Sequence, residues 1–152
     1  MNLKLRTVER REQAGPLSAL LEQAAREVSA SWSTRPPGEI ARRYLEHALG
    51  AREALLVVAE QKEADRPLAL AGSAASEDPL TGEVHPMLVL LYVDPSIRQR
   101  GVARELVREL RRQLAARGVG GLWARAGHND DAVISMGERW GFVRTWELMS
   151  SE

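Results

Sequence analysis

The sequence predicts an α/β (α+β) fold, with a mixed and mostly antiparallel central sheet and helices on both faces of that sheet. Three patterns support this prediction. Residues 54–59 are almost wholly apolar and rich in strand formers, which is typical of a central strand covered on both faces. Two more strand patterns follow after short polar turns, which indicates an antiparallel meander. From Ala103 to Leu114, apolar side chains recur at helical spacing with charged residues between them.

The first third of the chain contains one strand pattern and two helix patterns. Residues 3–8 alternate apolar and polar side chains, as a half-buried strand does. Gly15-Pro16 marks the start of the first helix, because proline is favoured in a first helical turn. Pro36-Pro37-Gly38 ends this helix, and an apolar stripe over residues 40–48 predicts a second helix that ends at Gly50.

The remaining elements are separated by turns rich in glycine, proline and aspartate. We expect strands over 54–59, 68–75 and 84–93, a helix ending near 117–118, a strand over 122–125, a helix over 131–140 and a final strand over 142–149. The predicted order is therefore strand, helix, helix, three strands, helix, strand, helix, strand.

Size and composition favour a single domain spanning residues 1–152, because 152 residues with 44% hydrophobic content can bury a substantial core. The formal net charge is zero, so we expect neither nucleic acid nor a membrane as a partner. No apolar run is long enough to span a bilayer or to form a signal core, which predicts a cytoplasmic protein. The chain has no cysteine, and its three histidines lack metal-ligand spacing, so we expect no metal site.

The turn between the strand ending at Val93 and the helix that follows is predicted to bind an anion. Pro95 removes a ladder donor, and Gly101 lets the backbone approach a ligand where the helix begins. Free backbone N–H groups and the positive end of the helix dipole attract anions at such a position. Arg98 and Arg100 are expected to add mobile positive charge, although both could also be ordinary solvated loop residues.

The pattern Arg98-x-x-Gly101-x-Ala103 resembles the acetyl-CoA-binding signature of the GNAT superfamily of N-acetyltransferases, usually written Q/R-x-x-G-x-G/A. The order of elements is similar to the GNAT fold along essentially the whole chain. The resemblance implies acetyl-CoA as the acyl donor, no metal, and a pantetheine arm lying between the strand at 87–93 and the strand at 122–125. It implies these cofactor-binding residues: Leu91, Val93, Arg98, Gln99, Arg100, Gly101, Val102, Ala103, Arg104 and Asn129.

Residues 129–142 resemble a second GNAT motif, N-x-x-A-x-x-L-Y-E-K-x-G-F, with one residue too many. Counting back from the end of the motif places the family tyrosine on Gly137, and counting forward from Asn129 places it on Met136. Neither residue can protonate the departing thiolate of CoA, so the usual general acid is missing. Asn129 could contact the cofactor, or it could cap the helix that follows.

The catalytic residues are unknown from sequence, with four candidates. Glu83 and His85 begin the third meander strand, where the resemblance implies a general base acting through water. Glu83 could instead be a turn residue, and His85 could simply be held extended by the proline after it. Tyr92 is useful only if strand alternation points its hydroxyl toward the ligand. His128 follows a strand end, although it could be an ordinary loop residue.

The resemblance implies direct transfer of an acetyl group from acetyl-CoA to a primary amine of a small molecule, peptide or protein, in a ternary complex. A homodimer, formed especially through the final strand, is also implied. The absence of the family tyrosine favours an alternative, a catalytically weak or inactive module that binds or senses acyl-CoA.

Overall fold

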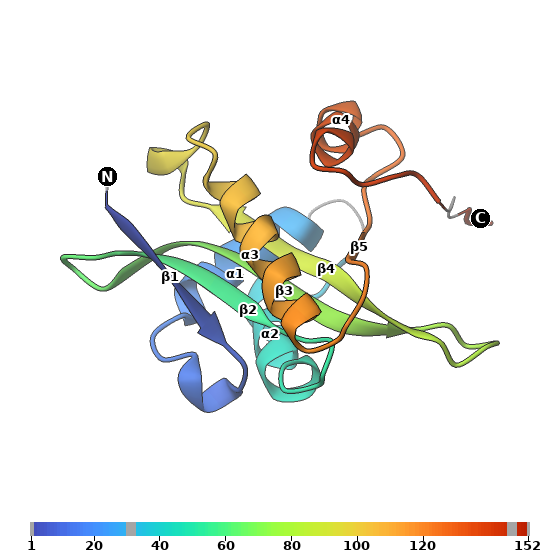
Figure 1. The fold of residues 1–152 in the computed structure, drawn as a ribbon, viewed down its shortest axis with the longest axis horizontal. Helices are drawn as coiled ribbons and strands as arrows, with labels where there is room; N and C mark the ends of the chain where they lie inside the picture. Colours follow the sequence, from blue (N-terminus) through green and yellow to red (C-terminus); the bar gives the residue numbers. More distant parts are fainter. Residues whose placement is uncertain (1, 30–32, 146–148, 152) are drawn as a thin grey trace.

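The computed structural model describes residues 2–29, 33–145 and 149–151. Within this part of the chain, five strands form one sheet in the order β1-β2-β3-β4-β5, with antiparallel pairing from β1 to β4 and parallel pairing between β4 and β5 (Figure 1). The elements are β1 Leu3–Val8, α1 Ser18–Ser29, α2 Pro37–Arg43, β2 Leu56–Gln61, β3 Arg66–Glu77, β4 Val84–Val93, α3 Val102–Ala116, β5 Trp123–Ala124 and α4 Asp131–Arg139. Single helical turns lie at Arg11–Gln13, Tyr44–Ala48 and Pro95–Ile97.

The sheet separates two apolar clusters, with α3 on one face and α1 and α2 on the other (Figure 1). Alternation along β2 supplies both clusters, since Leu56 and Val58 face α1 and α2 while Val57 and Ala59 face α3. Residues 54–59 are all fully buried, which confirms the prediction of a central strand covered on both faces. Each such valine or leucine contributes about 1.5–3 kcal/mol through burial, so this strand anchors the rest of the sheet.

The long helix α3 forms because an apolar stripe and surface ion pairs reinforce one another. Leu106, Leu110 and Leu114 are buried against the sheet at helical spacing. On the solvent side, Glu109 pairs with Arg112 one turn later, at 2.6 Å between Oε1 and the guanidinium. The helix is therefore held on one face only, and its N-terminus lies beside the end of β4.

The predicted final strand over 142–149 is wrong for the described residues. Residues 142–145 and 149 adopt no strand conformation, whereas 146–148 lie outside the described residues. The side chains of Val143 and Met149 are 79% and 88% exposed. A strand needs a neighbouring edge to pair with, and the neighbouring edge strand β5 is only two residues long. The predicted element order therefore holds only as far as α4.

Two boundaries on the α1–α2 side also differ from the prediction. Helix α1 begins at Ser18, after the glycine and proline that were expected to start it. The predicted second helix is divided into α2 and a π-helical turn over Tyr44–Ala48, where Leu49 N donates to Tyr44 O over 2.9 Å. No described helix combines the length and the apolarity that crossing a bilayer requires.

Candidate functional site

The strands β4 and β5 separate shortly after they meet. They pair only at Met87 with Trp123 and at Leu88 with Ala124, yet β4 continues to Val93 along its other neighbour, β3. Over roughly five residues, or about 17 Å, the outer edge of β4 therefore faces no strand among the described residues. Backbone N–H and C=O groups along this edge are available to an extended ligand, except the carbonyl of Val93, which accepts a hydrogen bond from Arg98 Nε over 2.8 Å.

A β-bulge lies at the point of separation. Gly72 is opposite Leu90 and Ser73 is opposite Leu88, so Val89 is the extra residue in β4. A bulge bends its strand, increases the local twist and leaves the extra residue outside the regular ladder. It directly follows the last residue of β4 that pairs with β5, so the bulge explains why the two strands part there.

The far end of this gap is closed by the turn between β4 and α3. Asp94 accepts hydrogen bonds from the hydroxyl and the backbone N–H of Ser96, at 2.6 and 2.9 Å, and the hydroxyl contributes most to lowering the pKa of Asp94. Ile97 is fully buried and anchors the turn in the α3-side cluster. The backbone then takes positive φ angles at Gln99 (63°) and Gly101 (77°). These two positive φ angles turn the chain from the end of β4 into the first residue of α3, Val102.

The N-terminus of α3 has no side-chain cap. Its first hydrogen bond runs from Glu105 N to Gly101 O over 3.1 Å, so the N–H groups of residues 102–104 precede the intrahelical ladder. A Cβ built on Gly101 would meet nothing within 4 Å, which means that the space above the turn is open. The predicted anion site therefore has the required donors, dipole and access.

Arg98 is not the mobile charge that the sequence suggested. Its Nε donates to Val93 O over 2.8 Å, its guanidinium pairs with Glu27 of α1 over 2.5 Å, and it lies 5.7 Å from the ring centroid of Tyr92. Arg98 therefore ties the turn to β4 and α1. Arg100 and Arg104 are exposed, and neither forms an ion pair with another described residue. Both side chains can therefore reach toward an anion.

The side chains of Leu91 and Val93 are half-buried against the α3-side cluster. Their contact with a ligand in the gap would therefore run mainly through the backbone. Val102 packs against the same cluster. Ala103 is half-buried, and Gln99 is exposed beside Gly101. The residues that the resemblance implied for cofactor binding follow one another from the end of β4 through the turn to the start of α3, whereas Asn129 lies in the loop before α4.

The structure brings together two of the four catalytic candidates. His85 Nε2 lies 3.9 Å from Glu83 Oε2, and its ring centroid lies 4.8 Å from that of Trp123 on β5. His85 is at the start of β4 and Glu83 directly precedes the strand, roughly 13 Å and roughly 20 Å along the chain from Val89, so they would act on the bulge only through intervening water or substrate. Tyr92 is buried in the α1–α2 cluster, at 7% exposure.

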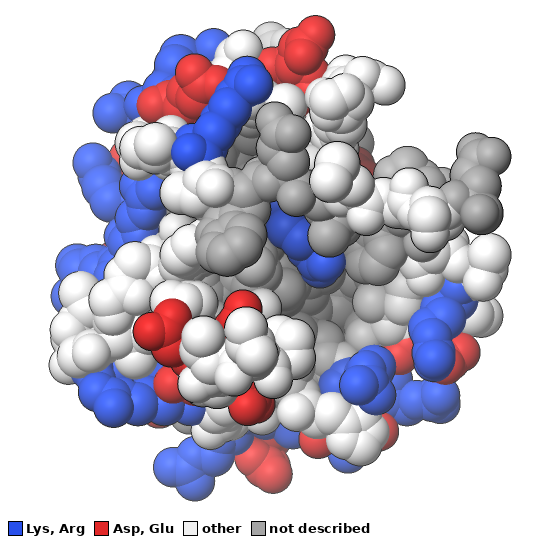
Figure 2. Space-filling model, turned by 90° about the vertical axis from the view of Figure 1, so that its right-hand side faces the viewer, with Lys and Arg blue, Asp and Glu red and all other residues white. Residues whose placement is uncertain are grey.

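The end of the molecule that carries β5, α4 and the β3–β4 hairpin is hollowed near its middle (Figure 2). Lys and Arg side chains lie along the left edge and at the lower right of this face, and Asp and Glu side chains lie both at its top and below its middle (Figure 2). His128 is exposed in the loop before α4, and within the described part of the chain it forms neither a hydrogen bond nor an ion pair with Glu83 or His85. This face carries both signs of charge, so it does not indicate a strongly charged ligand.

The loop before α4 resolves the two roles considered for Asn129. Asp130 is the N-cap and accepts a hydrogen bond from Val133 N over 3.3 Å, while Asn129 is exposed. Asn129 is therefore not needed as a cap. At the position of the family tyrosine, Met136 is half-buried and Gly137 has no side chain, although a Cβ there would lie 3.8 Å from Phe142. Neither residue supplies a proton.

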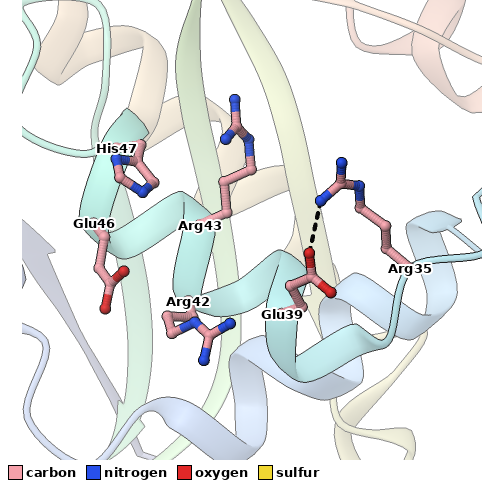
Figure 3. A pocket seen from close by; sticks show the side chains of 6 residues that line it. All are labelled: Arg35, Glu39, Arg42, Arg43, Glu46 and His47. Atoms are coloured by element: carbon pink, nitrogen blue, oxygen red, sulfur yellow. Dashed lines mark hydrogen bonds and ion pairs between the residues drawn. The ribbon is translucent and has the colours of Figure 1, made fainter.

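A second hollow, of about 440 Å³, lies along α2 and was not predicted from the sequence. Figure 3 shows its lining on the helix in front of the sheet: Arg35, Glu39, Arg42, Arg43, Glu46 and His47. Arg35 pairs with Glu39 over 2.6 Å. None of these residues comes from β4, β5 or the turn before α3, so we place the candidate site at the strand separation. The helical spacing of charged residues was the signal for this hollow.

Comparisons with known proteins identify the family and the fold of this chain. A sequence profile of the acetyltransferase (GNAT) family matches residues 17–142. No match to a curated protein is found.

Solved structures share the fold over nearly the whole chain. The aminoglycoside N-acetyltransferase AAC(6')-Iy, in complex with the bisubstrate analog CoA-S-monomethyl-acetylneamine, has a TM-score of 0.73 at 15% identity, covering 100% of this chain and 98% of the other. The ribosomal-protein-alanine N-acetyltransferase of Brucella melitensis biovar Abortus 2308 has a TM-score of 0.70 at 17% identity, covering 99% of each chain. A protein of Clostridium acetobutylicum described as a predicted acetyltransferase, solved with acetyl-CoA, has a TM-score of 0.74 at 16% identity, covering 99% of this chain and 96% of the other. At these identities the likeness shows a common α+β fold.

Proposed function

Because this chain belongs to the acetyltransferase (GNAT) family, we propose that it transfers an acetyl group from acetyl-CoA directly to a primary amine in a ternary complex. One observation carries the proposal: the uncapped N-terminus of α3 lies at one end of the edge that β4 exposes after leaving β5. A site for a diphosphate and a groove for an extended arm are therefore continuous. This continuity fits a long, anionic, strand-like substrate such as acetyl-CoA.

The residues present fit acetyl-CoA as a substrate. The N–H groups of residues 102–104 would donate to the diphosphate, with Arg100 and Arg104 adding positive charge. The free edge of β4 beyond Leu88 would pair with the pantetheine amides, as an added strand does. This mode leaves the thioester close to the bulge at Val89, where backbone groups have left the regular ladder.

The chemistry follows from this placement. The attacking amine must be neutral, and it gives up a proton as the new amide bond forms and the carbon–sulfur bond breaks. A backbone N–H at the bulge would stabilise the negative charge that develops on the carbonyl oxygen. Glu83 and His85 lie 3.9 Å apart where β4 begins, and we assign them the role of accepting this proton through intervening water. The same proton then reaches the thiolate of CoA through water, since neither Met136 nor Gly137 can supply one.

The acceptor that we propose is a primary amine of a small molecule, peptide or protein. Structural neighbours include aminoglycoside acetyltransferases and a ribosomal-protein-alanine N-acetyltransferase, so both acceptor classes occur on this fold. The mixed charge around the hollow in Figure 2 favours an acceptor whose amine is flanked by neutral polar groups over a polycation.

The proposal is tested with the purified chain, acetyl-CoA, and a mixed panel of aminoglycosides, polyamines and peptide N-termini. Release of CoA thiol together with a product heavier by one acetyl group supports the proposal. Initial rates should give intersecting double-reciprocal lines, because both substrates are bound before transfer. Binding of CoA should weaken about fivefold in Arg100→Ala and Arg104→Ala, if each contact contributes about 1 kcal/mol.

Arg112→Ala is the matched control, since Arg112 lies on the same helix two turns further on and pairs with Glu109. Equal loss of CoA affinity in the control would contradict the proposed diphosphate site. Parallel double-reciprocal lines would contradict direct attack.

The absence of an acid at Met136 and Gly137 favours one alternative, a module that binds acyl-CoA without efficient turnover. Tight CoA binding without acetylated product across the whole panel would favour this reading. Sustained CoA release that matches product formation would exclude it.

A further inference from the structure

A buried tyrosine hydroxyl joins the α2 side of the molecule to the sheet. Tyr44, the first residue of the π-helical turn after α2, is 6% exposed, and burial raises the pKa of its hydroxyl well above the ordinary value. Its oxygen lies 3.0 Å from Leu55 O and 2.9 Å from Ser73 O. Leu55 O already accepts a hydrogen bond from Ser73 N over 2.8 Å. We therefore assign the proton of the Tyr44 hydroxyl to the hydrogen bond with Ser73 O.

Ser73 completes this network with its own side chain. Its hydroxyl donates to Glu53 O over 2.9 Å and accepts from Leu55 N over 3.0 Å. Ser73 is fully buried, and its carbonyl receives the tyrosine proton where β3 extends past Leu56, the first residue of β2. The network therefore satisfies the carbonyl of Ser73 on β3 and the backbone groups of Glu53 and Leu55 just before β2.

The same residues of β3 define the bulge in β4. Gly72 and Ser73 are the consecutive residues of β3 that face Leu90 and Leu88, and the register shift between them places Val89 outside the ladder. A Cβ on Gly72 would lie 2.9 Å from the hydroxyl oxygen of Tyr44, so the absence of a side chain there lets the tyrosine approach the strand. The hydroxyl of Tyr44 thus contacts β3 at the two residues, Gly72 and Ser73, that pair with β4 where β4 leaves β5.

We propose that Tyr44 is a positioning residue for acetyl transfer, because its hydroxyl, through Gly72 and Ser73, fixes the bulge at Val89 that presents the β4 backbone to the thioester. This inference rests on the proposed function for its catalytic consequence. Tyr44 touches neither substrate in this arrangement. Removing the hydroxyl frees a buried carbonyl of β3 and lets the bulge shift along the strand.

The first test compares the wild-type enzyme with Tyr44→Phe, which keeps the ring and removes only the hydroxyl. A misplacement on the order of 1 Å at a reacting centre can cost up to about 100-fold in rate, so we expect kcat to fall by about 10-fold to 100-fold. The KM for acetyl-CoA and the affinity for CoA should be unchanged, because the turn before α3 and Arg98 are untouched. A wild-type kcat in Tyr44→Phe would overturn the proposal.

Val58→Ala is the matched control, since Val58 is fully buried in the same cluster on β2 and makes no contact through a polar side-chain atom. This variant lowers stability without altering the network, and its kcat should remain close to that of the wild type. An equal fall in kcat in Val58→Ala would show that Tyr44 acts only through stability, and would also overturn the proposal.

A second pair of variants tests the contact between Gly72 and Tyr44. Gly72→Ala should lower kcat, because the new Cβ would lie only 2.9 Å from the tyrosine oxygen. Combining Gly72→Ala with Tyr44→Phe removes that oxygen and leaves Cζ at 3.2 Å, so the double variant should lose less activity than the two single losses predict together. Strictly additive losses would contradict a shared mechanism.

Amide hydrogen exchange tests the bulge without turnover, and so separates this inference from the proposed function. Residues 88–91 should exchange faster in Tyr44→Phe, while α3 and the turn before it exchange as in the wild type. Unchanged exchange at residues 88–91 would overturn the positioning role. If residues 88–91 exchange faster but the wild-type protein acetylates none of the amines tested, the role of Tyr44 at the bulge would be supported. Only the proposed function would then be contradicted.

Discussion

Replacing Gly101 by alanine should weaken CoA binding, whereas the same replacement at Gly82 should not. Both glycines have similar positive φ angles, 77° and 73°, and a Cβ at either position would meet nothing within 4 Å. The two substitutions therefore carry the same backbone penalty and no steric clash. They differ only in place, since Gly101 precedes α3 and Gly82 lies in the turn between β3 and β4.

The magnitude follows from the left-handed conformation. Holding an L-residue there costs about 1–2 kcal/mol. If the turn keeps its shape, Gly101→Ala lowers the free energy of unfolding by that amount and leaves CoA binding unchanged. If the turn relaxes in the free protein, binding must restore the shape and the dissociation constant rises by about 5-fold to 30-fold. Relaxation is expected over residues 99–101, because they are exposed and Gln99 also has a φ of 63°, whereas Ile97 and Arg98 hold the first part of the turn in place.

Isothermal titration with CoA and urea unfolding of both variants measure the two quantities. We expect Gly82→Ala to lose about 1–2 kcal/mol of stability and no CoA affinity. Gly101→Ala should lose affinity for CoA, and its loss of stability should be smaller than that of Gly82→Ala. Gly101→Asn should recover part of the affinity, since asparagine tolerates the left-handed region better than alanine. Wild-type affinity in Gly101→Ala together with a smaller loss of stability than in Gly82→Ala, or an equal loss of affinity in Gly82→Ala, would refute the assignment of this turn.

Three further predictions concern the same region. Arg98→Ala should weaken CoA binding by up to about fivefold, because an exposed ion pair such as that with Glu27 contributes about 0.2–1 kcal/mol, and calorimetry that finds no change would contradict the anchoring role. Asp94→Asn should be less stable than the wild type at pH 7, as thermal unfolding measures. The pKa of Asp94 is lowered in the folded state, so its contribution is present above the unfolded pKa of about 3.9 and is lost as the pH falls through the lower folded value, where the two melting temperatures should converge. Gly137→Tyr should raise kcat if protonation of the thiolate limits turnover, whereas Gly137→Phe should not, and equal rates in steady-state assays would exclude a proton-donating role at this position.

Several features of the site were predictable because local sequence controls them. The strand at 84–93 has the predicted bounds, since a glycine-containing turn and Pro95 delimit it from both sides. The turn after it was predicted from Gly101, whose positive φ is a property of that one residue's backbone. The apolar stripe of α3 likewise depends only on spacing along the chain.

Other features depended on partners that are distant in sequence. Tyr92 was left open between two faces, and the bulge at Val89 shifts the alternation that would have decided the question. Arg98 was expected to be mobile, but its partner Glu27 lies 71 residues away on α1. The final strand over 142–149 was predicted from local strand and turn signals and does not form over the described residues, because strand structure requires an edge to pair with.

The sequence by itself determined the apolar periods, the glycine-dependent turn and the uncapped start of α3, because each arises from the stereochemistry of a few neighbouring residues. The tertiary structure decided where β4 leaves β5, which tyrosine reaches the sheet and which arginine is held in place. Those outcomes depend on register and on packing between elements, and a one-residue shift in pairing changes them without any change in local pattern.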